Sequence, residues 1–123
     1  MNEIIRQIEE AVSEVRIKSV PQETDIHAFI AEALEAHNIS FIHEARISPH
    51  KRADFLVGSV IIEIKKGRPS PAALSKQLYA YLAEASITGA VVITQRSIKL
   101  AAAINSKPVK QIALDRLWGI YLP

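Results

Sequence analysis

The sequence predicts an α/β fold in which helices flank a mixed central sheet. Three observations support this class. Apolar residues recur at helical spacing over residues 3–18 and again over 23–37, which is typical of amphipathic helices. Two runs rich in Val, Ile and Phe meet at Gly58-Ser59, a pair that favours a two-residue hairpin turn of type II′. The run 89–94 is apolar throughout, as expected for a strand buried on both faces.

The boundaries of the N-terminal elements follow from residues that interrupt these patterns. Pro21 ends the first helical pattern, whose apolar stripe we expect to pack on the core or to mediate self-association. The second helix should end near Asn38, which tolerates the left-handed conformation at a helix end. A first strand is expected over 39–47, and Ser48-Pro49 forms the turn into the hairpin.

The C-terminal half begins with a helix whose first residues carry clear start signals. Ser70 can cap the helix and Pro71 suits its first position, so the helix should run to about residue 85. Three further elements are expected after the apolar strand: a short helix over 96–104 and terminal strands over 109–114 and 118–122.

Composition limits the class of protein. A chain of 123 residues has room for one core, so residues 1–123 are expected to form a single domain, of which 1–20 is the N-terminal helical part. The chain has no Cys, which excludes disulfides, thiolate zinc sites and thiol nucleophiles. No apolar run reaches about 18 residues and the N-terminus lacks a signal-peptide pattern, so no membrane association and a cytoplasmic location are expected.

Charge is distributed unevenly although the formal net charge is only +2. Residues 1–36 are mainly acidic, whereas 46–76 are mainly basic and contain only two acids, Asp54 and Glu63. An anionic substrate is favoured near the basic segment, and phosphate is the simplest candidate.

The hairpin turn predicts which side chains face each other. If Val57 lies opposite Val60, Asp54 lies opposite Glu63 and Arg52 opposite Lys65, with the two carboxylates' Cβ atoms roughly 4.5–5.5 Å apart. Neighbouring carboxylates repel, but a divalent cation between them turns repulsion into chelation, and oxygen ligands suit Mg²⁺. Alternatively, Glu63 and Lys65 lie on the exposed face of an edge hairpin, in surface ion pairs worth about 0–1 kcal/mol.

The sequence at this hairpin resembles a known family. Asp54, followed after eight residues by Glu63-Ile64-Lys65, resembles the active-site signature of the PD-(D/E)XK nuclease superfamily. The superfamily includes restriction endonucleases, Holliday-junction resolvases and small mobile-element nucleases, and the latter two are the nearest in kind. Ala53 stands where the signature has Pro. The expected order of helix, three strands, helix and strand over about residues 23–95 is similar to the restriction-endonuclease-like core.

The resemblance implies a Mg²⁺-dependent (or Mn²⁺-dependent) endonuclease that hydrolyses phosphodiester bonds of DNA. Asp54, Glu63 and the carbonyl of Ile64 would hold the metal ion, and Lys65 would orient the attacking water. A Glu near the start of the first core helix often joins this site, and Glu23 is the matching position. The remaining residues that the resemblance or the charge pattern points to are Gln77 beside the site, Tyr81 beneath it, and Lys51, Arg52, Lys66, Arg68 and Lys76 as DNA contacts.

Several alternatives stay open. Glu23 also benefits its helix dipole, Asp25 and Glu32 are other choices for the helix carboxylate, and Glu44 either borders the site or is a surface acid. Gln77 alone is an ordinary helix-boundary residue. The chain could also be an inactive nuclease-fold module that binds DNA or protein, or a subunit active only with a partner. A homodimer is expected if both strands of a duplex are cut.

Overall fold

The structure is a computed structural model that describes residues 2–14 and 23–117, with the backbone alone at 23–25 and 116–117. Its elements are α1 (Glu3–Val12), α2 (Glu23–Ala36), β1 (Ile42–Ser48), β2 (Lys51–Val57), β3 (Val60–Lys65), α3 (Pro71–Leu82), β4 (Gly89–Thr94), β5 (Ala103–Ile104), β6 (Lys107–Ala113) and α4 (Leu114–Leu117). No helix within the described ranges has the length and apolar character needed to cross a lipid bilayer.

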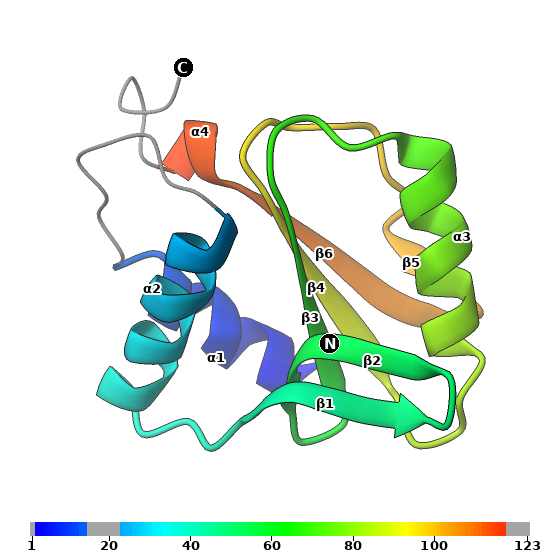
Figure 1. Ribbon diagram of the computed structural model, residues 1–123, viewed down its shortest axis with the longest axis horizontal. Coiled ribbons are helices and arrows are strands. Elements are labelled where there is room, and N and C mark those ends of the chain that lie inside the picture. Colours follow the sequence, from blue (N-terminus) through cyan, green and yellow to red (C-terminus); the bar gives the residue numbers. More distant parts are fainter. Residues whose placement is uncertain (1, 15–22, 118–123) are drawn as a thin grey trace.

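The six strands form one mixed sheet in the order β1-β2-β3-β4-β6-β5, which confirms the predicted α/β class with a mixed sheet. The central strands β3, β4 and β6 are parallel, and the remaining pairs are antiparallel. Figure 1 shows α1 and α2 on one side of the sheet and α3 on the other. The carboxyl ends of the three parallel strands therefore lie at the same edge of the sheet.

Each face of the sheet carries its own apolar core. Ile8 of α1 and Ile30 of α2 pack with Val60, Ile62 and Ile64 of β3 on one face. On the other face, residues of α3 pack with Ile61 of β3 and Val92 of β4. Side chains alternate along β3, so Ile61, Glu63 and Lys65 point toward α3. This confirms the predicted division of the β3 side chains between the two faces of the sheet.

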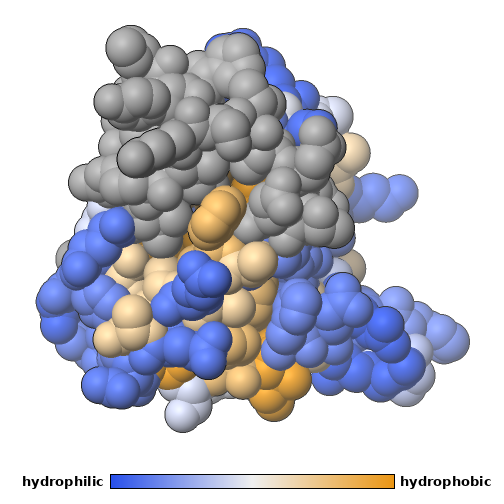
Figure 2. Space-filling view, turned by 60° about the vertical axis from the view of Figure 1, so that its left-hand side comes forward, coloured by the Kyte–Doolittle hydropathy of each residue, from blue (hydrophilic) through white to orange (hydrophobic). Residues whose placement is uncertain are grey.

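The apolar stripe of α1 packs within the chain. Ile5, Ile8, Ala11 and Val12 are all buried, and Asn2 caps the helix by accepting from the backbone N–H groups of Ile4 and Ile5. The described part of this stripe therefore contributes to the core of the chain itself. The helix ends at Val12 rather than residue 18, and residues 15–18 lie outside the described part. Figure 2, turned so that this side of the molecule comes forward, shows apolar surface gathered in one patch between hydrophilic residues.

The turn at Gly58-Ser59 sets the register of the hairpin as predicted. Val57 pairs with Val60, and Gly58 has a φ of 58° while Ser59 does not have a positive φ, which agrees with a type II′ turn. A Cβ at position 58 would lie 3.0 Å from the end of the Ile4 side chain, so α1 packs closely over this turn.

The short helix predicted over 96–104 is wrong. Residues 97–101 are irregular, and β5 pairs with β6 through a two-residue turn at Asn105-Ser106, whose φ angles of 54° and 62° define type I′. The Gln111 side chain holds the irregular segment by accepting from Ile98 N–H (2.9 Å) and donating to its carbonyl (2.8 Å). These bonds replace the intrahelical ones. The strand predicted over 118–122 lies outside the described residues.

Candidate active site

The backbone ladder between β2 and β3 opens at Asp54 and Glu63. The paired residues end at Phe55 and Ile62, so the predicted strand pairing continues neither to Asp54 and Glu63 nor to Arg52 and Lys65. Side chains replace the ladder at this point: Asp54 N–H donates to Glu63 Oε1 at 3.1 Å, and Ile64 N–H donates to Asp54 Oδ2 at 2.7 Å. Each carboxylate thus satisfies a backbone donor of the opposite strand. The strands form a fork that presents both carboxylates together.

The strand on the other side of β2 is distorted at the same level. Glu44 of β1 has a φ of 55°, and the β1–β2 register skips the Glu44–Asp54 pair while it holds at Ala45–Ala53 and His43–Phe55. Such a conformation costs a non-glycine residue of the order of 1–3 kcal/mol and is concentrated at functional sites. The Glu44 side chain is exposed. Glu44 therefore affects the fork through its backbone conformation and not through its carboxylate.

The two carboxylates of the fork differ in exposure. Glu63 is 2% exposed, whereas the side chain of Asp54 is 25% exposed. Lys65 follows on the same face of β3 and places its Nζ 3.8 Å from Glu63 Oε2, with 30% of its side chain exposed. The lysine can therefore reach both Glu63 and a molecule at the opening.

Residues of α3 close the fork from one side. Gln77 Nε2 donates to Glu63 Oε2 at 3.3 Å and lies 3.5 Å from the Tyr81 hydroxyl, which donates to the Arg52 carbonyl at 2.6 Å. Burial, followed by the negative charge of Glu63, raises the pKa of the Tyr81 phenol above its usual value. The hydroxyl therefore stays protonated and anchors β2 to α3.

Replacing Tyr81 by Phe is expected to lower the free energy of unfolding by about 1 kcal/mol, because the Arg52 carbonyl loses its donor. Chemical unfolding in urea measures this change. Tyr79 is the matched control: the residue is 60% exposed on the same helix, so Tyr79→Phe should leave the midpoint unchanged. Equal midpoints for Tyr81→Phe and the wild type would contradict the anchoring role.

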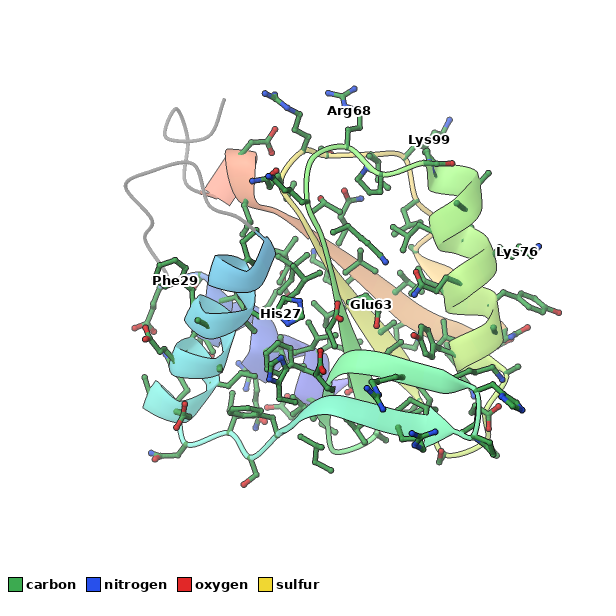
Figure 3. The ribbon with its side chains drawn as sticks, in the orientation of Figure 1. His27, Phe29, Glu63, Arg68, Lys76 and Lys99 are labelled. Atoms are coloured by element: carbon green, nitrogen blue, oxygen red, sulfur yellow. The ribbon has the colours of Figure 1, made fainter. Side chains whose placement is uncertain are left out.

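His27 was not predicted and lies on the opposite side of the fork from α3. Its Nε2 is 3.8 Å from Asp54 Oδ1, and its Nδ1 is 3.0 Å from Nε2 of His43, whose ring stacks on Phe55 with centroids 4.6 Å apart. Figure 3 shows His27 on the side of α2 that faces the sheet, with Glu63 at the centre of the molecule. Its only signal in the sequence was its place beside the apolar stripe of the second helix.

Of the three candidate helix carboxylates, the structure describes the side chain of only one. Glu23 is the first residue of α2, one helical turn before His27, and its side chain lies outside the described part, as does that of Asp25. Glu32 is exposed and lines a groove between α1 and α2, together with Ala11, and is therefore not at the fork.

The predicted DNA contacts differ in their exposure and in their partners within the chain. Lys51 donates to Glu84 at 2.8 Å in a half-buried ion pair, so it already has a partner within the chain. The side chains of Arg52, Lys66, Arg68 and Lys76 are exposed. In Figure 3, Arg68 and the unpredicted Lys99 project from loops at one edge of the sheet, and Lys76 projects from α3.

The donor set of the fork fits Mg²⁺. Among the side chains that the structure describes, those of residues 2–14 and 26–115, no three His, Cys, Asp or Glu groups come close enough to form a metal site by themselves. Mg²⁺ typically needs only one or two protein carboxylates, because it keeps several waters and takes further oxygens from the substrate. Asp54 and Glu63 supply such a pair, and the backbone at Ile64 adjoins it.

Comparison with known protein families, with curated proteins and with solved structures finds no significant match for this chain. The function is therefore inferred from the geometry of the fork.

Proposed function

We propose that this protein is a divalent-metal-dependent nuclease that hydrolyses DNA phosphodiester bonds, with a restriction-endonuclease-like core and the active-site signature of the PD-(D/E)XK superfamily. The observation that carries the proposal is the fork, at which Asp54 and Glu63 meet where the ladder opens. Lys65 and Gln77 both lie next to Glu63.

The burial of Glu63 favours a functional over a structural role for the pair. A carboxylate that is 2% exposed, beside a second carboxylate and a lysine 3.8 Å away, is costly to desolvate. An exposed edge hairpin would place these groups in water, where surface pairs contribute about 0–1 kcal/mol. The fork instead keeps two acids together in a site closed by α3, which is useful only if a cation or a substrate binds there.

The residues of the fork have separable roles in this chemistry. A bound divalent ion would lower the pKa of a water molecule and neutralise charge on the scissile phosphate. Asp54 and Glu63 hold the ion, with the Ile64 carbonyl as a further donor. Lys65 stabilises negative charge on the attacking oxygen or on the phosphate, and Gln77 fixes the Glu63 carboxylate through its Oε2. His27 borders Asp54 from the α2 side, with its Nε2 3.8 Å from Asp54 Oδ1.

Cleavage of a mixed substrate panel tests the proposal. Supercoiled plasmid, single-stranded circle and four-way junction are incubated with Mg²⁺, Mn²⁺ or EDTA, and products are separated on gels. We expect cutting in Mg²⁺ or Mn²⁺ and none in EDTA. DNA retention without cutting on any substrate would contradict the nuclease and favour the inactive binding module or the partner-dependent subunit.

A further inference from the structure

A pocket that is not lined by Asp54 or Glu63 lies at the carboxyl ends of the three parallel strands. It has a volume of about 750 Å³, within the usual range for small-molecule sites. Its lining comes from the segments that follow β3, β4 and β6: Arg68 and Pro69 after β3, Ile98 and Lys99 after β4, and Asp115 after β6. Ligands of open α/β sheets bind outside the carboxyl ends of the strands, so this position favours a binding role.

Hydrogen bonds tie the three segments together. Gln95, which is 8% exposed, accepts at its Oε1 from Gly67 N–H (2.6 Å) and at its carbonyl from Asp115 N–H (2.9 Å). Arg96 N–H also donates to the Gly67 carbonyl at 3.2 Å. The walls of the pocket are therefore held in place before any ligand arrives, which lowers the entropic cost of binding.

The pocket combines two cations with an acceptor that lacks a donor. Arg68 and Lys99 line the pocket and are exposed. Figure 3 shows both side chains projecting from loops at one edge of the sheet. Asp115 Oδ1 is buried and has no hydrogen-bond partner among the described residues. A buried acceptor without a donor is costly and is rare in folded proteins. Asp115 itself is only partly buried and lines the pocket, so its carboxylate group can meet a ligand there.

The Asp115 carboxylate limits which anions can bind in the pocket. An inorganic phosphate attracted by Arg68 and Lys99 would also meet the Asp115 carboxylate, which repels it. A nucleotide carries a phosphate for the cations and, in cytosine and adenine, an exocyclic amino group that can donate to a carboxylate. Pro69 and Ile98 offer apolar contact to the base.

We propose that this pocket binds one unstacked nucleotide of the nucleic-acid substrate, with its phosphate on Arg68 and Lys99 and a base amino group on Asp115. The inference rests on the proposed nuclease function and adds a substrate class, single-stranded or frayed DNA, because a base reaches such a pocket only out of the stack. Arg68 follows Lys65 by three residues, which is at most roughly 11 Å.

Binding of short oligonucleotides tests the pocket without cleavage. Fluorescein-labelled hexadeoxycytidylate and hexathymidylate are titrated with the full chain in EDTA and followed by fluorescence anisotropy. We expect the cytosine probe to bind about tenfold more tightly, because thymine has no exocyclic amino group. Asp115→Ala should remove this preference. Arg68→Ala should weaken both probes and lower the salt dependence of binding, since it removes a phosphate contact.

Lys76→Ala is the matched control, because Lys76 is an exposed cation on α3 and does not line the pocket. It should leave the cytosine-to-thymine ratio unchanged. Equal binding of the two probes, a preference that survives Asp115→Ala, or no binding of either probe would each overturn the pocket. Cleavage in Mg²⁺ is scored separately: cutting without base preference contradicts only the pocket, and base-selective binding without cutting contradicts only the nuclease.

Discussion

Replacing Asp54 by Asn is expected to lower metal-dependent DNA cleavage by about 10³-fold or more while the fold survives. The substitution removes one of two carboxylates that hold the ion, and a loss of about 4 kcal/mol of transition-state stabilisation corresponds to that factor. Asparagine is preferred to alanine because its side-chain oxygen still accepts from Ile64 N–H, which Asp54 Oδ2 does at 2.7 Å. Initial rates on the best substrate of the panel, measured at several Mg²⁺ concentrations, give the factor.

Glu10→Gln is the control for this substitution, because it also neutralises an acid but lies on α1, where Glu10 is exposed beside Arg6. Its cleavage rate should equal that of the wild type. A wild-type rate for Asp54→Asn would rule out the metal site at the fork.

Replacing Lys65 by Met is expected to lower the cleavage rate by about 10²–10³-fold and to leave metal binding intact. The variant keeps much of the side chain's apolar length but loses the ammonium that lies 3.8 Å from Glu63 Oε2 and stabilises charge in the transition state. Single-turnover rates at saturating Mg²⁺ separate this defect from weaker metal binding.

Lys110→Met serves as the matched control, since Lys110 forms an exposed ion pair with Glu9 on the far side of the sheet from α3. Surface pairs of this kind contribute about 0–1 kcal/mol, so the rate should not change. If Lys65→Met cut as fast as Lys110→Met, the catalytic role of Lys65 would be refuted.

The geometry of the hairpin could be predicted because a two-residue turn leaves little freedom. Gly58-Ser59 fixes Val57 opposite Val60, and the two-residue period then assigns Glu63 and Lys65 to one face of β3. The positions of Asp54 and Glu63 beside each other follow from the same register. The buried strand β4 was predictable for a similar reason, since an apolar run bounded by Gly89 has few alternatives.

Other features depend on contacts between distant segments and left little trace in the sequence. The ladder opens because the carboxylates themselves accept the backbone N–H groups, which a pairing rule does not anticipate. His27 and His43 are 16 residues apart and meet only in the folded chain, where a side chain of α2 reaches one of β1. The segment before β5 resembled a helix by spacing, but Gln111 holds it in an irregular conformation.

Thermal unfolding with and without divalent ions tests the central claim, that the fork is a metal site, and it requires no substrate. The melting temperature of the wild type should rise by roughly 5–10 °C at an Mg²⁺ or Mn²⁺ concentration about 100-fold above the dissociation constant. Lys65→Met should show the same rise and Asp54→Asn little or none. An unchanged melting temperature for the wild type, or an equal rise for Asp54→Asn, would contradict a metal site at Asp54 and Glu63.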